Sequence, residues 1–302
     1  MADQIIHQGP VCRVALESHE PWGQVIAKYL NDEYPTPQQI KKFVHEYDIG
    51  ANISIDGLRK PLKYEKDQNQ YRILFEYVDG ISLNDYRQTN PTLLESLQVF
   101  CSITKTLTEL HAHSIIHKDV SPNNIIVEPE KLKAVLIDLS ASTQYSLKTQ
   151  HLGNPEKIDG SIRYMSPEQT GRMNRVLDHR SDLYSLGIVL YEFYTGKLPF
   201  IQSDPLELVH AHIAIVPESA NKVTPTVPVA LSSIIDKLLE KNAEQRYQSA
   251  SGLLHDLENC IDQLTKKGSI DSFTLSEKDV FIRFQLHQKL YGRELEIAQL
   301  MN

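Results

Sequence analysis

Short apolar runs alternate with polar breaks over the first 80 residues, and this pattern predicts strands of a small antiparallel sheet. Residues 5–30 contain IIHQGPVCRVAL, then HEPWG, then QVIAKYL, so apolar stretches are separated by turn-forming sequences. Residues 71–78, YRILFEYV, predict another strand, and Asp79-Gly80 predicts the turn that follows it. The first quarter of the chain is therefore expected to be mainly β-structure.

Helical spacing of apolar residues interrupts this pattern once and then dominates the rest of the chain. Thr36, Pro37 and Gln39 predict a capped helix start, because Thr and Gln three residues apart can form a capping box. Thr92 and Glu95 predict a second start of the same kind, ahead of a long helix. Further helices are expected within 182–195, 229–240 and 250–264.

The change from strands to helices predicts an α+β chain with two unequal lobes joined near residues 76–80. We expect an N-terminal lobe at 1–78 and a helical lobe at 79–265. Residues 266–280, KKGSIDSFTLSEKDV, are polar and lack periodicity, so they predict a linker at the start of a third segment, 266–302.

Composition narrows the functional classes. The formal net charge is −8 and the basic residues are scattered, which argues against a nucleic-acid surface or an anionic membrane anchor. The three cysteines, Cys12, Cys101 and Cys260, are widely spaced and odd in number, which indicates reduced thiols. No run approaches the ~20 apolar residues that span a bilayer. These features together predict a soluble cytoplasmic protein.

The candidate chemistry lies in two polar loops framed by apolar runs, at 115–127 (IIHKDVSPNNIIV) and 136–140 (LIDLS). Phosphoryl transfer needs a carboxylate that orients the attacking hydroxyl, a role that Asp119 can fill. It also needs oxygen ligands for Mg²⁺, which Asn124 and Asp138 can supply. A strand-loop-strand hairpin would bring both loops to one edge.

These two loops resemble those of protein kinases. His117-Lys118-Asp119, with Asn124 five residues on, resembles the catalytic loop, and Asp138-Leu139-Ser140 resembles the metal-binding triplet. The resemblance implies a bilobal fold that binds ATP and Mg²⁺ and transfers the γ-phosphoryl group to a protein Ser or Thr hydroxyl. It implies catalytic roles for Lys28, Asp119 and Asn124, with Asn124 and Asp138 as metal ligands.

Segments upstream of the loops fit the same family. Lys28 ends VIAK and Glu46 lies on the next helix, which resembles the ion pair that holds a lysine against the nucleotide phosphates. Residues 74–78, LFEYV, resemble the hinge. The resemblance assigns Phe75 as gatekeeper and the backbone groups of Glu76 and Val78 as adenine contacts.

Segments downstream also resemble kinase motifs. GSIRYMSPE at 160–168 resembles the end of an activation segment, with Glu168 paired structurally to Arg246 in NAEQRYQSA. SDLYSLG at 181–187, with Asp182, Ser185 and Gly187, resembles the helix start whose aspartate holds the catalytic-loop backbone. Ser161 is a candidate for orienting Asp119, with an exposed loop serine as the alternative.

The chain departs from the family pattern at several positions. Only Gly9 stands where a glycine-rich loop should lie, and Val11 and Arg13 resemble the residues that follow it; the resemblance places Val11 at the nucleotide. Ser121 replaces a lysine that contacts the transferring phosphate, and Ser140 replaces the glycine of the metal-binding triplet. Lys118 replaces an arginine, so a bidentate grip on a phosphorylated loop is lost.

YPTP, HKD, SPEQTGRMNR and the final KLYGRE resemble a bacterial subgroup in which a serine/threonine kinase domain precedes a signalling ATPase module and a histidine kinase. The kinase resemblance covers about 1–265, and 286–302 resembles the entry to the ATPase module. No GxxxxGK[ST] phosphate loop is present in the sequence. We therefore expect the chain to be part of a longer protein, whose later modules would be its partners.

Two functions remain open at this point. The first is a serine/threonine protein kinase, and the second is a pseudokinase scaffold that binds nucleotide or partners without phosphoryl transfer. The scaffold is favoured by the missing glycines, Ser121 and Ser140, whereas catalysis is favoured because every residue that performs the chemistry is retained.

The hydroxyls of the activation segment are candidate phosphosites: Ser142, Thr143, Ser146 and Thr149. The histidine pairs His111/His113 and His210/His212 lack metal-ligand spacing, so helix-end or core roles are expected.

Overall fold

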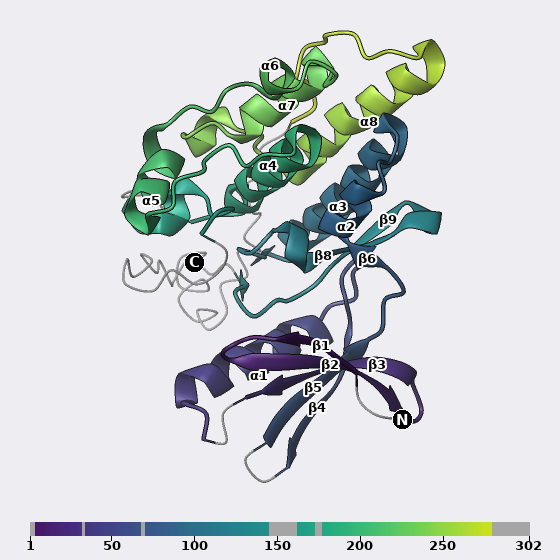
Figure 1. Ribbon diagram of the computed structural model, residues 1–302, viewed down its shortest axis with the longest axis vertical. Helices are drawn as coiled ribbons and strands as arrows, with labels where there is room; N and C mark the ends of the chain where they lie inside the picture. Colours follow the sequence, from purple (N-terminus) through teal and green to yellow (C-terminus); the bar gives the residue numbers. More distant parts are fainter. Residues whose placement is uncertain (1–3, 32–33, 68–69, 145–161, 173–176, 280–302) are drawn as a thin grey trace, which may run out of the picture.

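The structure is a computed structural model and describes residues 4–31, 34–67, 70–144, 162–172 and 177–279. Two lobes lie one above the other, a strand-rich N-terminal lobe and a larger helical lobe (Figure 1). The predicted bilobal α+β fold is confirmed. No helix among the described residues is long and apolar enough to cross a membrane.

The N-terminal lobe is built on a five-stranded antiparallel sheet with the order β1-β2-β3-β5-β4. β3 is the most buried strand of the sheet, because Val25, Ala27 and Lys28 all lie inside the lobe. The strands are β1 (Gln4–Gln8), β2 (Cys12–His19), β3 (Gly23–Leu30), β4 (Pro61–Asp67) and β5 (Gln70–Glu76).

Helix α1 (Pro37–Ala51) packs on this sheet. It begins as predicted, because Thr36 Oγ1 accepts a hydrogen bond from the Gln39 amide and the Gln39 side chain accepts one from the Thr36 amide. Phe43 on its inner face joins a cluster with Ile73 and Phe75 of β5. This packing fixes the direction in which the helix presents Glu46.

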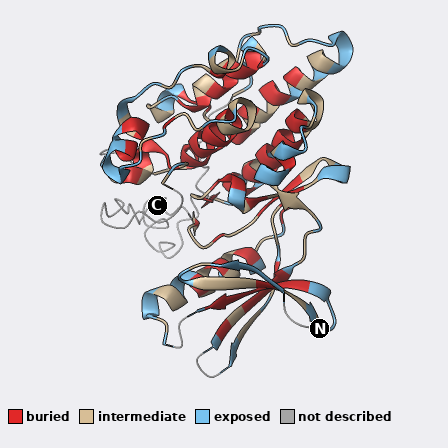
Figure 2. Ribbon diagram, in the orientation of Figure 1, coloured by how far each residue is buried: buried red, intermediate tan, exposed pale blue. Residues whose placement is uncertain are grey.

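The helical lobe has α3 and α4 at its centre, and most residues of α4 are buried (Figure 2). The predicted capping box of Thr92 and Glu95 starts α3. The helices are α2 (Leu83–Gln88), α3 (Leu93–Ala112), α4 (Arg180–Thr195), α5 (Pro205–Ala214), α6 (Ala220–Val223), α7 (Val229–Leu238) and α8 (Ala250–Lys267). α5 was not anticipated, although Asp204 caps it and Pro205 begins it.

Short strands on the helical lobe carry the loops of interest. β8 (Ile125–Glu128) and β9 (Lys133–Leu136) form an antiparallel hairpin in which Ile125 pairs with Leu136. β6 (Ile81–Ser82) flanks this hairpin, and β7 (Ile115–Ile116) pairs with β10 (Thr143–Gln144). The hairpin places residue 124 and residue 138 at the same end, as the sequence predicted.

The lobes are also joined behind the hinge, in addition to the covalent connection after β5. The Leu136 amide donates to the Gly57 carbonyl at 2.8 Å, and the Arg59 amide donates to the Leu136 carbonyl at 2.9 Å. Gly57 has φ +85°, and a side chain there would overlap Thr106 of α3. Only glycine therefore permits this close approach of the two lobes.

The segment after α8 is packed rather than extended into solvent. Gly268 ends the helix with φ +75°, and Phe273 and Leu275 pack against the core of the helical lobe. Asp279 accepts hydrogen bonds from the Gln248 amide at 2.6 Å and the Ser249 hydroxyl at 2.8 Å. Residues 268–279 contain no helix or strand and are anchored to the helical lobe, and the linker at 266–280 stays a prediction.

Candidate active site

Lys28 on β3 is at the centre of an ion cluster between the lobes. Its Nζ lies 2.7 Å from Glu46 Oε2 and 3.1 Å from Asp138 Oδ2. Glu46 is 1% exposed, whereas the Asp138 side chain is 30% exposed. The predicted Lys28–Glu46 ion pair is confirmed, and the carboxylate of Asp138 is the part of the cluster that solvent can reach.

Burial and charge oppose one another in this cluster. Burial alone would lower the pKa of Lys28, but Glu46 and Asp138 more than offset that effect and raise it. Burial would raise the pKa of Asp138, but the Lys28 ammonium and hydrogen bonding from Ser140 hold it well below its usual range. Burial raises the pKa of Glu46 in spite of Lys28. Lys28 is therefore cationic and Asp138 anionic at neutral pH.

Asp119 and Asn124 meet in the loop before β8. The Asn124 side-chain amide donates to the Asp119 carboxylate at 2.8 Å and to its carbonyl at 2.9 Å. The Ile137 amide donates to the Asn124 carbonyl at 3.0 Å, which ties this loop to the segment that carries Asp138. The two predicted polar loops are therefore adjacent, and the side-chain oxygens of Asn124 and Asp138 belong to the same end of one hairpin.

Asp182 of α4 binds the backbone of the predicted catalytic loop. Its carboxylate accepts hydrogen bonds from the amides of His117 at 2.9 Å and Lys118 at 2.8 Å, and His111 Nε2 lies 2.9 Å away. Lys118 has φ +67°, a conformation that costs a non-glycine residue about 1–3 kcal/mol. The two hydrogen bonds to Asp182 hold the loop in this shape, which confirms the predicted contact.

Glu168 and Arg246 form the predicted structural ion pair, buried in the helical lobe. Two parallel contacts of 2.7 and 2.9 Å join the guanidinium to the carboxylate. Arg246 also donates to the carbonyls of Arg180, Glu240 and Lys241, and Ser181 donates to Glu168. This pair contacts the activation-segment end and no residue of the Lys28 cluster.

The residues of the predicted hinge differ in their exposure to solvent. Phe75 is buried, Glu76 is exposed and Val78 is half-buried. The Glu76 amide donates to the Lys60 carbonyl at 2.9 Å, so the Glu76 carbonyl is the group that could accept a bond from adenine. The adenine contacts of Glu76 and Val78 stay predictions.

The segment that replaces a glycine-rich loop is a tight hairpin between β1 and β2. The Gly9 amide donates to the Cys12 carbonyl at 2.9 Å, and Asn31 donates to the carbonyls of Gly9 and Val11 at 2.6 and 2.9 Å. The Val11 side chain is 45% exposed. The loop is thus held by Asn31 rather than by a run of glycines, and the role of Val11 at a nucleotide stays a prediction.

Several predicted residues do not form part of the described site. Ser146, Thr149, Ser161 and the segment 286–302 lie outside the described residues. Ser142 is buried and its hydroxyl donates to the Leu139 carbonyl at 2.5 Å, so it is not presented for phosphorylation in this structure. The described residues contain no cluster of three or more His, Cys, Asp or Glu side chains that could hold a metal ion.

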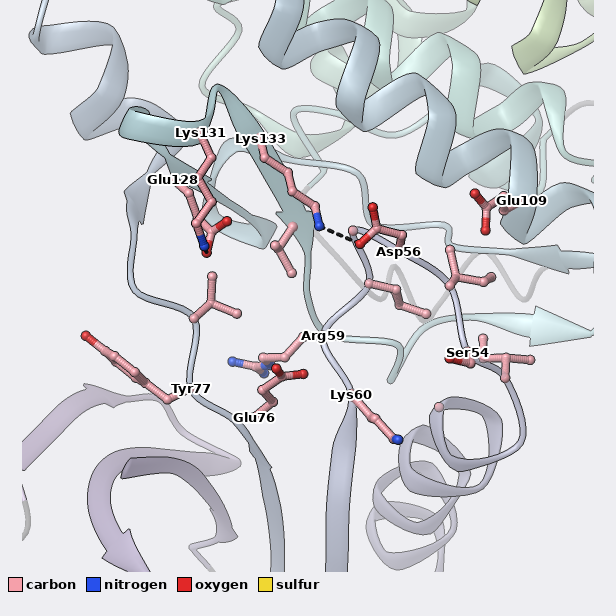
Figure 3. A pocket seen from close by; sticks show the side chains of 17 residues that line it. Ser54, Asp56, Arg59, Lys60, Glu76, Tyr77, Glu109, Glu128, Lys131 and Lys133 are labelled. Atoms are coloured by element: carbon pink, nitrogen blue, oxygen red, sulfur yellow. Dashed lines mark hydrogen bonds and ion pairs between the residues drawn. The ribbon is translucent and has the colours of Figure 1, made fainter. Parts of the chain in front are cut away.

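Three contacts at the site were not anticipated. His45, next to Glu46 on α1, lies 2.9 Å from the Ser142 carbonyl through Nε2. Cys12 lies close enough to Lys28, Glu46 and Asp138 for their charges to act on its thiol, whose pKa is raised by burial. Arg59 lines a cavity of about 600 Å³ behind the hinge, which Lys28 and Asp138 do not line (Figure 3). No local sequence pattern marks any of these contacts, because each joins segments far apart in the chain.

Comparison with known proteins assigns the chain to a family. The family described as protein kinase domain matches residues 2–257. A protein named a probable serine/threonine-protein kinase of Clostridium perfringens is 32% identical over 86% of this chain and 37% of its own length. The serine/threonine-protein kinase PrkC of Bacillus subtilis is 27% identical over 85% of this chain and 39% of its own length.

A third relative has a different architecture. The hybrid signal transduction histidine kinase G of Dictyostelium discoideum is 38% identical over 46% of this chain but only 5% of its own length. The chain therefore spans well under half the length of these relatives. The match over residues 2–257 and the ion cluster agree with the prediction of a serine/threonine protein kinase, and the chain belongs to the protein kinase domain family.

Proposed function

We propose that this chain transfers the γ-phosphoryl group of ATP to Ser or Thr hydroxyls of proteins. The observation that carries the proposal is the position of Lys28 between Glu46 and Asp138, at 2.7 and 3.1 Å. Asp119 and Asn124 are tied to the same hairpin end as Asp138. The cation for the phosphates, the oxygen ligands and the base are therefore all retained.

The side chains divide the tasks of the reaction among them. Lys28, held by Glu46, would bind the nucleotide phosphates. Asp119 accepts the proton of the substrate hydroxyl while that oxygen forms a bond to the γ-phosphorus, and the bond from the γ-phosphorus to the β–γ bridging oxygen breaks to release ADP. Asn124 stabilises the charge on Asp119 through its side-chain amide.

Mg²⁺ fits the donor set, because Asp138 is anionic and partly exposed. Asn124 and Asp138 also lie at the same end of the β8–β9 hairpin. These two residues would hold the ion, which supplies charge neutralisation for the phosphates. Both ligands are oxygen atoms, with no sulfur or imidazole among them, and this favours Mg²⁺ over softer metals.

A scaffold that binds nucleotide without transfer is the alternative function. Its support is Ser121, a small residue where a cation would contact the transferring phosphate, together with the single Gly9 of the β1–β2 turn. Loss of one such charge would slow transfer by ~10²-fold or more without removing the base. The retained Asp119 and Asp138 favour catalysis.

The wider setting is part of the proposal. We expect a cytoplasmic signalling protein in which lobes at 1–78 and 79–265 precede a linker and an ATPase module starting within 266–302. The hybrid histidine kinase among the relatives supports a connection to histidine kinase modules. All three cysteines lie in described segments and are unpaired, which supports a reducing compartment.

Incubation with γ-labelled ATP, Mg²⁺ and a mixed Ser/Thr/Tyr peptide pool tests the proposal. Label should appear on Ser and Thr but not on Tyr, and Asp119→Ala should lower the rate by ~10²–10⁴-fold. The matched control is Asp85→Ala, an exposed carboxylate of α2 that should leave the rate unchanged. Equal labelling by the wild type and Asp119→Ala would exclude the proposed enzyme.

A further inference from the structure

The segment after α8 runs back along the helical lobe to the start of the same helix (Figure 1). Gly268 ends α8, and the chain returns so that Asp279 lies beside Ser249, the N-cap of that helix. The Asp279 carboxylate accepts hydrogen bonds from the Gln248 amide at 2.6 Å and from the Ser249 hydroxyl at 2.8 Å. The end of this segment is therefore fixed to the loop that precedes α8.

Gly252 makes room for this contact. An added Cβ at Gly252 would lie 2.3 Å from Asp279 Oδ1 and 2.6 Å from Asp279 Cβ, which is closer than such atoms can approach. Gly252 lies in the first turn of α8, where alanine would favour the helix more than glycine does. Glycine at this position thus serves the docking of Asp279 and not the formation of the helix.

The residue that binds Asp279 also holds the start of α4. His179 Nε2 lies 2.9 Å from the Gln248 carbonyl oxygen, and His179 is the N-cap of α4. Arg180, the first residue of α4, donates through Nη1 to the side-chain oxygen of Gln248 at 2.8 Å. Gln248 therefore connects the segment after α8 with the start of α4 through three direct contacts.

The start of α4 carries the carboxylate that binds the catalytic loop. Asp182 lies two residues after Arg180 and accepts hydrogen bonds from the amides of His117 and Lys118 at 2.9 and 2.8 Å. Lys118 has φ +67° and precedes Asp119, so the loop needs these bonds to keep its shape. The contacts from Asp279 therefore end one helical turn away from the group that holds the loop of the base.

We propose that Asp279 is a positioning residue, which holds the start of α4 through Gln248 and thereby the catalytic loop through Asp182. Release of Asp279 would loosen the start of α4, and the strained backbone of Lys118 would relax in a larger share of molecules. Undocking of the segment after α8 would in this way slow phosphoryl transfer. The inference rests on the proposed function for its effect on transfer, whereas its effect on the loop requires no nucleotide.

Hydrogen exchange of backbone amides, measured on the full chain by mass spectrometry, tests the inference without nucleotide. Asp279→Ala removes the acceptor, and Gly252→Ala displaces Asp279 while it favours the helix. In both variants the amides of residues 115–120 should exchange about three- to tenfold faster than in the wild type. The amides of β3 (Gly23–Leu30) should keep their wild-type rates, whereas a general loss of stability would speed exchange in both segments.

Asp271→Ala is the matched control, because it removes another acid of the same segment. Asp271 is exposed and pairs at 2.8 Å with Lys267, at the opposite end of α8 from Ser249. This variant should leave exchange at residues 115–120 unchanged. Asp279→Asn keeps one oxygen acceptor, so its exchange should lie between those of Asp279→Ala and the wild type.

Phosphoryl transfer supplies the second measurement. In Asp279→Ala, kcat for a Ser/Thr peptide should fall about three- to tenfold, because the loosened loop carries Asp119. The KM for Mg-ATP should stay within about twofold, because Lys28 and Glu46 lie in the other lobe. The double variant with Gly252→Ala should be no slower than either single variant, since both substitutions remove the same contact.

The outcomes remain decisive if one variant does not fold, because Asp279→Ala and Gly252→Ala test the same contact independently. Wild-type exchange at residues 115–120, or equal acceleration there and in β3, would overturn the inference. Failure of the proposed function would appear differently, as no transfer by the wild type. Selective acceleration at residues 115–120 in the variants would still support the positioning role in that case.

Discussion

The two buried ion pairs of this molecule, Lys28–Glu46 and Glu168–Arg246, have the same kind of charges but different surroundings. Arg246 directs its guanidinium to both oxygens of Glu168 and to three backbone carbonyls. Lys28 shares its ammonium between Glu46 and Asp138, and Glu46 Oε1 has no partner among the described residues. One pair is fully hydrogen-bonded, and the other retains capacity for a ligand.

This difference distinguishes an ion pair that stabilises the fold from one that can bind a ligand. A buried pair whose hydrogen bonds are complete resists change, because removing one partner leaves a charge in the interior. A pair with an open oxygen and a half-exposed carboxylate such as Asp138 can exchange partners when a phosphate arrives. Buried polar groups that lack partners are uncommon, and here Glu46 Oε1 belongs to the carboxylate that binds Lys28.

The largest effect should come from the fully bonded pair. Arg246→Ala should lower the free energy of unfolding by about 3–5 kcal/mol, because Glu168 would remain buried without its cation. Chemical denaturation measures this, and the exposed Arg172→Ala should change stability by less than about 0.5 kcal/mol. A similarly small effect of Arg246→Ala would show that the pair does not brace the lobe.

The second effect, that of Asp138→Asn, should appear mainly in the rate of phosphoryl transfer. Asp138→Asn keeps the size of the side chain but removes the anionic ligand, so phosphoryl transfer should fall by about 10²–10³-fold. The free energy of unfolding should also fall, but less than for Arg246→Ala, because the ionised Asp138 carboxylate pairs with Lys28 and its pKa lies below its usual range. An unchanged rate with Mg²⁺ would remove Asp138 from the metal site.

Glu46→Gln should have a smaller effect on the rate and distinguishes the two pairs directly. Lys28 loses its strongest partner, so kcat/KM for Mg-ATP should fall about 10- to 100-fold. Stability should change by less than about 1 kcal/mol, because a neutral amide removes a buried charge and Asp138 still pairs with Lys28. A loss of stability as large as that of Arg246→Ala would mean that both pairs are structural.

The smallest effect concerns pH. Burial would raise the pKa of Asp182, but its bonds from His111 and the loop amides hold it low. Its stabilisation is therefore present above about pH 4, where unfolded aspartate ionises, and is lost as pH falls. Glu46 has a raised pKa, so its contribution is lost as pH rises through that pKa.

Denaturant titrations from pH 3 to pH 7 measure how the free energy of unfolding changes with pH through Asp182 and through Glu46. Asp182→Asn should reduce the loss of stability on acidification below about pH 4, and Glu46→Gln should reduce the loss of stability above that pH. Each change should be on the order of 1 kcal/mol. Identical pH profiles for the two variants would contradict the assigned directions.

Local signals explain why much of the fold and the site could be predicted. The capping boxes at Thr36 and Thr92 are three-residue patterns, and the spacing from Asp119 to Asn124 lies within one loop. The hairpin that joins Asn124 to Asp138 follows from two apolar runs with a short turn. Such features depend on neighbouring residues, so a sequence displays them.

Contacts that depend on tertiary packing were not predictable in the same way. Arg59 belongs to no local motif, and its position over Phe75 exists only because β4 and β5 pair in one sheet. His111 was expected at a helix end or in the core, but its bond to Asp182 requires α3 and α4 to meet. The packing of residues 268–279 was missed because their apolar residues lack helix or strand periodicity.

The most direct test measures binding and transfer in one sample of the wild type and of Asp119→Ala. Both proteins should bind Mg-ATP with dissociation constants within about threefold of each other, because Asp119 acts on the substrate hydroxyl and Lys28 remains paired with Glu46 for the phosphates. The wild type should transfer the γ-phosphoryl group to a Ser/Thr peptide, and Asp119→Ala should transfer it ~10²–10⁴-fold more slowly. Tight binding by both proteins with no transfer by the wild type would contradict the account and leave a nucleotide-binding scaffold.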